Sequence, residues 1–397
     1  MMMTTMTMTP PPIPAPSNDL PLLTAALPGT GGQLRVAPED FEVEELPAYE
    51  PSGEGDHLFL WIEKRDRTTR EVAQALARRL GISERDVGYA GLKDKRALTR
   101  QFFSVPGFPS ADGWCERIAQ ALGALPGGVH PNEDPIERAR RDLTDHGFRV
   151  VFHEHHSNKL KTGHLRGNRF RIRLREVHPD ALERAQAIAA ALAKSGLPNA
   201  FGPQRFGRDG QNARLGRGLV LGENRPELIR VRRDRFLRRL CVSAFQSLLF
   251  NRVLTERIAE GLFDQAIEGD LMKKLDTGGL FTSANAGEDT PRVARFEISP
   301  TGPIFGHRMM RPASSAWQRE QRVLQSEGIE LASFAPLKAD GEGSRRPMRI
   351  PIALDVKADA EGELVLTFDL PKGAFATVLL REVMKGDVAL PEELDAG

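Results

Sequence analysis

The segment RFRIRLR, residues 169–175, constrains the fold more than any other stretch, because apolar and basic residues alternate in it without a break. Successive side chains of a β-strand point to opposite faces of a sheet. Phe170, Ile172 and Leu174 therefore lie on one face, and four arginines lie on the other. The segment predicts a strand with one apolar face and one cationic face.

The cationic face has two interpretations. It is either the solvated outer side of a sheet or a surface for phosphate groups, which arginine binds with paired donors. The preceding loop, NKLKTGHLRGN, adds further basic residues, and residues 230–239, RVRRDRFLRR, form a second basic field. The formal net charge is only +1, so these fields are local. Their clustering favours an extended polyanion as a partner.

The length of 397 residues allows two domains with separate cores. The two cysteines, Cys115 and Cys241, form no C-x-x-C pair, which argues against a disulfide framework and a thiolate zinc site. No apolar run is long enough to predict a membrane span. The N-terminal residues 1–28, rich in Met, Thr and Pro, lack the features of a signal peptide and predict a disordered tail. We expect a cytoplasmic protein.

Periodicity predicts the order of the elements. Residues 57–65 alternate as a strand, and Thr68 with Glu71 forms a capping box before a helix. Residues 179–196 read as a second helix, with Pro179 near its start and Gly196 beyond its end. After this helix the composition becomes rich in Gly and Arg, which we interpret as the start of a mostly helical region. Strand patterns return near the C-terminus. The simplest arrangement is an α+β domain built from both chain ends, with an inserted helical domain.

The segment GYAGLKDKRALTRQ, residues 88–101, places Asp94 between Lys93 and Lys95, with Arg96 and Arg100 close behind. One interpretation is a surface acid paired with its neighbours. The other is a reactive carboxylate in a packed loop, where nearby cations keep the acid charged and able to act as nucleophile or base. Cations beside one carboxylate would suit chemistry on a sugar or base within a polyanion.

Other catalytic templates are missing from the sequence. The segment GTGGQL lacks the Gly-Lys-Ser/Thr end of a P-loop, and no G-x-S-x-G motif occurs. The histidines of HEHH, residues 153–156, alternate at a strand end and cannot all face one ion without a turn. We therefore expect no metal site.

Several segments resemble, in order, the blocks of the tRNA pseudouridine synthase D (TruD) family. They are APEDFEVEE, PSGEGDHLFL, AGLKDKRALTRQ, LRGNRFRIRLRE, GLPNAFGPQRFG, SAFQSLLFN and LPKGAFATVLLRE. The resemblance covers most of residues 30–385. It implies an α+β fold in which a pseudouridine synthase catalytic domain, a mixed or antiparallel sheet with flanking helices, is interrupted by a mainly α-helical TRUD domain. The implied boundaries are 29–198 and 350–397 for the catalytic domain and 199–349 for the insert.

The resemblance also implies the activity and the site. The family isomerises a uridine of tRNA to pseudouridine, typically U13 in the D-arm, with one aspartate and no cofactor. That aspartate corresponds to Asp94, which would either attack C1′ or remove the C2′ proton. Asn168 and Phe170 would line the uracil pocket, and Phe375 would pack over the base. A lysine of the family is replaced here by Arg35, which keeps the charge in a planar form.

The expected substrate contacts are therefore Arg35, Lys93, Lys95, Asn168, Phe170 and Phe375. The expected contacts to the RNA backbone are Lys159, Lys161, Arg166, Arg171, Arg173 and Arg205. The expected partner is tRNA, without a membrane or an obligate protein partner. An alternative is a non-catalytic RNA-binding or tRNA-folding protein on the same scaffold, which would need the basic fields but not Asp94.

Overall fold

The computed structural model describes residues 20–107 and 147–386. These residues form two compact units. The sheet unit comprises residues 29–107, 147–189, 353–376 and 383–386, and the helical unit comprises residues 20–28, 190–352 and 377–382. Residues 1–19 of the expected tail, and Cys115, lie outside the described residues. Thr24, within the expected tail, is buried, and its hydroxyl donates to Glu382 Oε2 at 2.6 Å.

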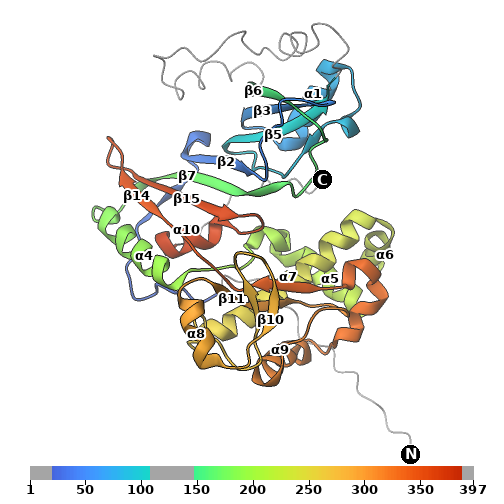
Figure 1. Cartoon of the computed structure of the whole chain (residues 1–397), viewed down its shortest axis with the longest axis vertical. Helices are drawn as coiled ribbons and strands as arrows, with labels where there is room; N and C mark the ends of the chain where they lie inside the picture. The colour runs from blue at the N-terminus through green and yellow to red at the C-terminus, as the bar shows by residue number, and fades with distance from the viewer. Residues whose placement is uncertain (1–19, 108–146, 387–397) are drawn as a thin grey trace, which may run out of the picture. The chain divides into compact units, whose positions relative to one another are not determined.

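The sheet unit is built on a nine-stranded sheet (Figure 1). Its main path runs β14-β15-β7-β2-β5-β3-β6, while β1 pairs with β7 and β4 pairs with β5. The β2–β5 pair is parallel and the others are antiparallel. The strands are β1 (Gly31–Leu34), β2 (Phe41–Pro47), β3 (His57–Arg65), β4 (Gly88–Tyr89), β5 (Leu98–Pro106), β6 (Phe148–His156), β7 (Leu165–Val177), β14 (Asp355–Ala358) and β15 (Leu364–Pro371).

Helix α1 (Thr69–Leu80) covers one face of this sheet. Thr68 and Glu71 form the capping box that the sequence predicted, and Gly81 ends the helix in the left-handed conformation, with φ of 65°. Alternate residues of β3, Leu58, Leu60 and Ile62, are buried in one apolar cluster with α1. Their neighbour Phe59 belongs to a second cluster on the other side. The alternation expected for residues 57–65 is therefore confirmed.

The helical unit combines helices with a second sheet. Its strands run in the order β10-β9-β11-β12, and a short pair joins β13 to β8. Helices α5 (Gln211–Val220), α6 (Pro226–Arg233), α7 (Arg235–Ala259), α8 (Ala286–Ala294) and α9 (Ser314–Ser326) belong to this unit. Its strands are β8 (Leu197–Pro198), β9 (Leu271–Lys274), β10 (Leu280–Thr282), β11 (Ile298–Ile304), β12 (Ser344–Pro347) and β13 (Arg349–Ile350). Helices α4 (Ala181–Ser195) and α10 (Ala376–Met384) contain residues of both units.

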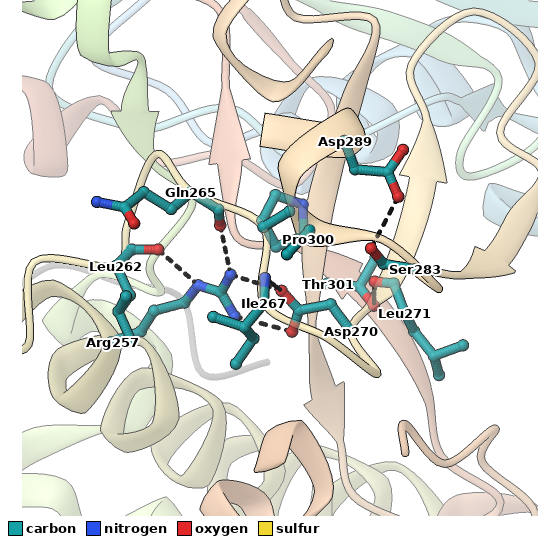
Figure 2. Close-up of polar contacts among 12 residues, drawn as sticks. Arg257, Leu262, Gln265, Ile267, Asp270, Leu271, Ser283, Asp289, Pro300 and Thr301 are labelled. Atoms are coloured by element: carbon teal, nitrogen blue, oxygen red, sulfur yellow. Dashed lines mark hydrogen bonds and ion pairs between the residues drawn. The ribbon is translucent and has the colours of Figure 1, made fainter. Parts of the chain in front are cut away.

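A buried ion pair links the C-terminal end of α7 to the start of β9 (Figure 2). Arg257 donates to both carboxylate oxygens of Asp270, at 2.9 and 2.6 Å, and to the backbone carbonyls of Leu262 and Gln265. Both side chains of the pair are about 5% exposed or less. Such a pair is costly to break from one side, so it fixes the turn between helix and strand. The mixed α+β architecture agrees with the fold class expected from the sequence.

Candidate active site

The loop that carries Asp94 runs from β4 to β5, and contacts to its main-chain groups hold it in place. Gly88 lies so close to the carbonyl of Leu160 that no Cβ could be accommodated. The Gln101 side chain donates to the carbonyl of Gly91 at 2.9 Å. The Thr69 hydroxyl, at the start of α1, accepts from the Lys93 amide at 2.9 Å. These contacts fix the main chain of the loop, in which Ala90 is buried and Leu92 is exposed.

Asp94 forms an ion pair with Arg35. Arg35 Nη2 lies 2.5 Å from Asp94 Oδ2, and the two side chains are 6% and 30% exposed, respectively. The Arg35 guanidinium also lies 3.8 Å above the centre of the Phe41 ring. A buried cation thus backs a carboxylate that solvent or a ligand can reach.

Arg35 occupies an unfavourable position in two respects. Its φ is +59°, in the left-handed region that non-glycine residues rarely adopt, and its buried Nε has no hydrogen-bond partner among the residues that the structure describes. Backbone strain of this kind persists where the surroundings impose it, and it is concentrated at functional sites. Together with the ion pair, these features single out Arg35 and Asp94 in the sheet unit.

Lys64 fixes the main chain at Asp94, and the sequence analysis did not identify it. Its side chain is fully buried, and Nζ donates to the carbonyls of Asp94 and Arg67, at 2.8 and 2.5 Å. The only signal in the sequence is a lysine at the end of an apolar strand. That signal could not indicate which carbonyls the ammonium would meet.

Lys93, which we expected to contact the substrate, lies in a buried ion pair. Its ammonium lies 2.8 Å from Glu45 Oε2 on β2, and the side chains are 4% and 1% exposed. Because this charge is buried and paired, Lys93 anchors the loop and offers no cation at the surface. Lys95 is partly exposed, and its charge helps to lower the pKa of Glu71, after the larger effect of the hydrogen bond from Thr68.

Asn168 and Phe170 come from β7 in adjacent positions of one face. Phe170 is 8% exposed, stacks on Phe368 with centroids 5.1 Å apart, and meets the edge of Phe41 at 6.1 Å. Phe41 therefore connects Phe170 to Arg35 through ring contacts. Within the described part of the chain, the buried Asn168 Oδ1 has no hydrogen-bond partner, which is costly for a polar atom and consistent with an acceptor reserved for a ligand.

Phe375 lies in the turn between β15 and α10, and its side chain is partly buried. The last residues of β15 pair with β7 at the same end that carries Asn168: Leu370 pairs with Asn168 and Pro371 with Gly167. The turn bearing Phe375 therefore leaves the sheet beside Asn168. The structure thus brings Asp94 and Arg35 into direct contact, links Phe170 to them through Phe41, and places Asn168 and the Phe375 turn at one end of β7.

The arginines of β7 share one face as predicted, but the face is not a free basic surface. Each guanidinium meets a carboxylate of a neighbouring segment. The pairs are Arg169 with Asp369, Arg171 with Glu42, Arg173 with Asp359 and Arg175 with Asp40, at distances of 2.7 to 2.9 Å. Arg171 and Arg173, which we expected to contact the RNA backbone, are thus neutralised in this structure by Glu42 of β2 and by Asp359.

The loop before β7 keeps more exposed charge. Lys161 and Arg166 are exposed, and Arg166 Nε donates to the carbonyl of Pro47 at 2.8 Å. Lys159 is half-buried and donates to the carbonyl of Arg85. These contacts leave the positive charges without a carboxylate in the described residues, so the loop stays a basic surface.

Arg205 belongs to the helical unit, in the turn Pro203–Phe206. Its guanidinium donates to the hydroxyls of Ser243 and Ser247 on α7 and lies 5.9 Å from the centre of the Phe201 ring. Arg346 lies over the same ring, at 4.2 Å. Burial lowers the pKa of Arg205, and burial together with the Arg205 charge lowers the pKa of Arg346 to about 10. Two neighbouring guanidiniums of this kind favour the binding of an anion.

A metal site needs several ligating side chains close together, and a membrane span needs a long apolar helix. In residues 20–107 and 147–386, no three His, Cys, Asp or Glu side chains are grouped to hold a metal ion. None of the helices in these residues combines the length and apolar character needed to cross a membrane.

Known proteins resemble this chain over nearly its whole length. A profile of the family described as tRNA pseudouridine synthase D (TruD) matches residues 19–227 and 232–383. A tRNA pseudouridine synthase D of Anaeromyxobacter sp. (strain Fw109-5) is 52% identical over 375 residues, which cover 94% of this chain and 99% of the relative. One from Thermus thermophilus is 43% identical over 368 residues, with 92% of each chain covered.

The fold has a counterpart among solved structures. A crystallised protein of Methanosarcina mazei that carries the same family name aligns with a TM-score of 0.66. The alignment covers 92% of this chain and 96% of the other, at 24% sequence identity. At this identity the likeness concerns the fold alone.

Proposed function

The chain belongs to the tRNA pseudouridine synthase D family and is therefore an isomerase of tRNA uridine, and we propose that it acts on U13 in the D-arm with Asp94 as the reacting carboxylate. The cytoplasm, where tRNA is used, is the expected compartment. The site residues below are assigned as parts of this proposal.

The reaction is balanced without a cofactor. The C1′–N1 bond of the uridine breaks, the uracil turns, a C1′–C5 bond forms, the C5 proton leaves, and N1 takes up a proton. Nothing is oxidised or reduced in these steps. Asp94 either attacks C1′ and displaces the uracil, or removes the C2′ proton to give a glycal; both routes need a carboxylate at the sugar. The target nucleotide must first leave its stack, as in other enzymes that act on bases.

The observation that carries this assignment is the ion pair between Arg35 and Asp94. It holds an accessible carboxylate, 30% exposed, against a guanidinium that is almost fully buried. A pre-oriented charge needs little reorganisation during the reaction. Lys64 and Lys93 hold the main chain on both sides of this pair through buried contacts.

The remaining residues of the sheet unit serve the base and the backbone. Asn168 Oδ1 would accept a hydrogen bond from a uracil N–H, which would satisfy its unpartnered oxygen. Phe170 and Phe375 would hold the detached uracil, with Phe170 using the part of its ring that Phe41 and Phe368 leave uncovered. Lys95, Lys159, Lys161, Arg166 and, in the helical unit, Arg205 would contact phosphates; Arg171 and Arg173 would do so only by exchanging a carboxylate for a phosphate.

The test compares Asp94→Asn with the wild type on tRNA labelled with tritium at C5 of uridine. We expect tritium release to disappear in the variant while tRNA binding stays within about twofold. Primer extension after carbodiimide treatment of wild-type product would locate the modified position, which we expect at 13. Asp86→Asn, which removes an exposed acid upstream of the same loop, is the matched control and should stay fully active.

Residual isomerisation by Asp94→Asn would reject Asp94 as the reacting group. A wild-type chain that binds tRNA but never releases tritium would instead favour the non-catalytic RNA-binding alternative.

A further inference from the structure

A pocket of about 360 Å³ lies along α1 in the sheet unit. Its lining includes Arg67, Arg78, Arg79, Glu71, Gln74 and Phe148. Arg67 and Arg78 are exposed, while Arg79 is half-buried, with its guanidinium 5.2 Å from the centre of the Phe148 ring. None of these three arginines figures in the site described above.

The three arginines of this pocket carry more positive charge than its acid balances. Within the described parts of the chain, none of its three arginines forms an ion pair, in contrast to the arginines of β7. The single acid of the pocket, Glu71, is engaged in the capping box, where it accepts from the Thr68 amide at 2.7 Å. A hollow with three unpaired guanidiniums and an amide is suited to an anion with several oxygens.

One end of the pocket, at Arg67, lies near the main chain of Asp94. The ammonium of Lys64 donates to the carbonyls of both Arg67 and Asp94, so the main chain at one end of the pocket lies next to the main chain of the reactive loop. Arg78 and Arg79 lie in the last turn of α1, at its other end. The 12 residues of α1 extend about 18 Å at 1.5 Å per residue.

We infer that this α1 pocket binds the phosphodiester backbone of the RNA whose target nucleotide lies at Asp94. The inference rests on the proposed function, because the RNA strand must enter or leave the reactive loop by some path. The length of α1 corresponds to about five nucleotides at the duplex rise of 3.4 Å. Phosphates along it would meet Arg67 first and Arg78 and Arg79 last.

The experiment measures the binding of a tRNA transcript by the full chain at several KCl concentrations. The variant is Arg67→Gln with Arg78→Gln, which leaves the packing of Arg79 on Phe148 in place and keeps good helix formers in α1. We expect the affinity at 0.1 M salt to fall about tenfold, and the salt slope to lose roughly 0.7 to 1 for each arginine.

The matched control is Arg295→Gln with Arg308→Gln, which removes the same formal charge from arginines that already face Glu297 and Glu342. We expect the control to keep the wild-type slope. If the double variant fails to fold, the single variants Arg78→Gln and Arg78→Glu give the same test. We expect the charge reversal to lose more of the tRNA affinity.

The outcomes separate this inference from the proposed function. An unchanged slope in the α1 variants, or an equal loss in the control, overturns the inference, whatever the activity of the wild type. A wild-type chain without synthase activity overturns the proposed function, yet a selective loss of slope in the α1 variants would still support an RNA backbone site there.

Discussion

Lys93 and Glu45 form a buried ion pair, with Nζ 2.8 Å from Oε2, that ties the loop carrying Asp94 to β2. Replacing Lys93 by Met leaves the Glu45 carboxylate buried without its cation. We expect the free energy of unfolding to fall by about 3 to 5 kcal/mol, since a buried charge without a partner is strongly destabilising. Urea unfolding monitored by fluorescence checks this value.

The double variant Lys93→Met with Glu45→Gln is the control for this pair. It removes both charges. In the wild type the Phe102 amide donates to Glu45 Oε1 at 3.3 Å, and the glutamine side chain keeps an acceptor for this hydrogen bond. We expect it to recover most of the lost stability. If Lys93→Met alone is as stable as the wild type, the pair does not hold the loop.

Arg35 faces Asp94 with a planar guanidinium stacked over Phe41. Arg35→Lys keeps the charge and loses the stacking, so we expect single-turnover isomerisation to slow by no more than about tenfold. Arg35→Met removes the charge opposite the carboxylate, and a loss of about 100-fold is expected, as for other pre-oriented charges in active sites. Arg65→Met, at a half-exposed arginine paired with Glu39, should leave the rate unchanged. Equal rates for Arg35→Met and the wild type would exclude Arg35 from the chemistry.

Glu71 gives α1 a pH-dependent contribution to stability. The hydrogen bond from the Thr68 amide, assisted by the charges of Lys95 and Arg67, lowers the pKa of Glu71 below its ordinary value of 4.5. A lowered pKa in the folded state stabilises the protein above the ordinary pKa, and this contribution is lost as the pH falls through the lowered value. We expect Glu71→Gln to be less stable than the wild type by about 1 kcal/mol at pH 7. The difference should vanish in unfolding curves below about pH 3; a constant difference across pH 3 to 7 would contradict this account.

Much of the fold could be predicted because its signals are local. The capping box at Thr68, the alternation in β3 and the helix expected at residues 179–196, observed as Ala181–Ser195, each depend on residues a few positions apart. The sheet of the helical unit was not anticipated, because its strands are short and two of them contain proline: Pro300 and Pro303 in β11, and Pro347 in β12. Such strands carry little periodicity of their own.

Local patterns in the sequence did not indicate how the charged residues expected in the site are paired. Alternation placed the β7 arginines on one face, yet the acids that neutralise them come from β2, from β15 and from turns far away in the sequence. The same holds for Lys93, whose partner Glu45 lies 48 positions earlier. Whether a cation is free for RNA or already paired depends on such long-range contacts, which no local pattern encodes.

Arg205 and Arg346 hold two guanidiniums near one aromatic ring in the helical unit, and burial lowers the pKa of each. A lowered pKa of a cation means that folding disfavours its charged form. We therefore expect Arg205→Met to leave the free energy of unfolding unchanged or to raise it, while tRNA affinity falls at least several-fold. Thermal unfolding and equilibrium binding on the same samples provide the two measurements.

Arg217 provides the contrast, because it is a buried arginine of the same unit that is paired with a carboxylate, with Nε 2.5 Å from Glu327 Oε2. Arg217→Met should destabilise the protein by about 1.5 to 3 kcal/mol, because Glu327 then loses one of its two arginine partners and keeps only Arg252. The change in the free energy of unfolding on substitution by Met thus distinguishes an arginine that stabilises the fold from one that does not. If Arg205→Met destabilises as strongly as Arg217→Met, Arg205 is a structural residue, and its expected contact with the RNA backbone loses its support.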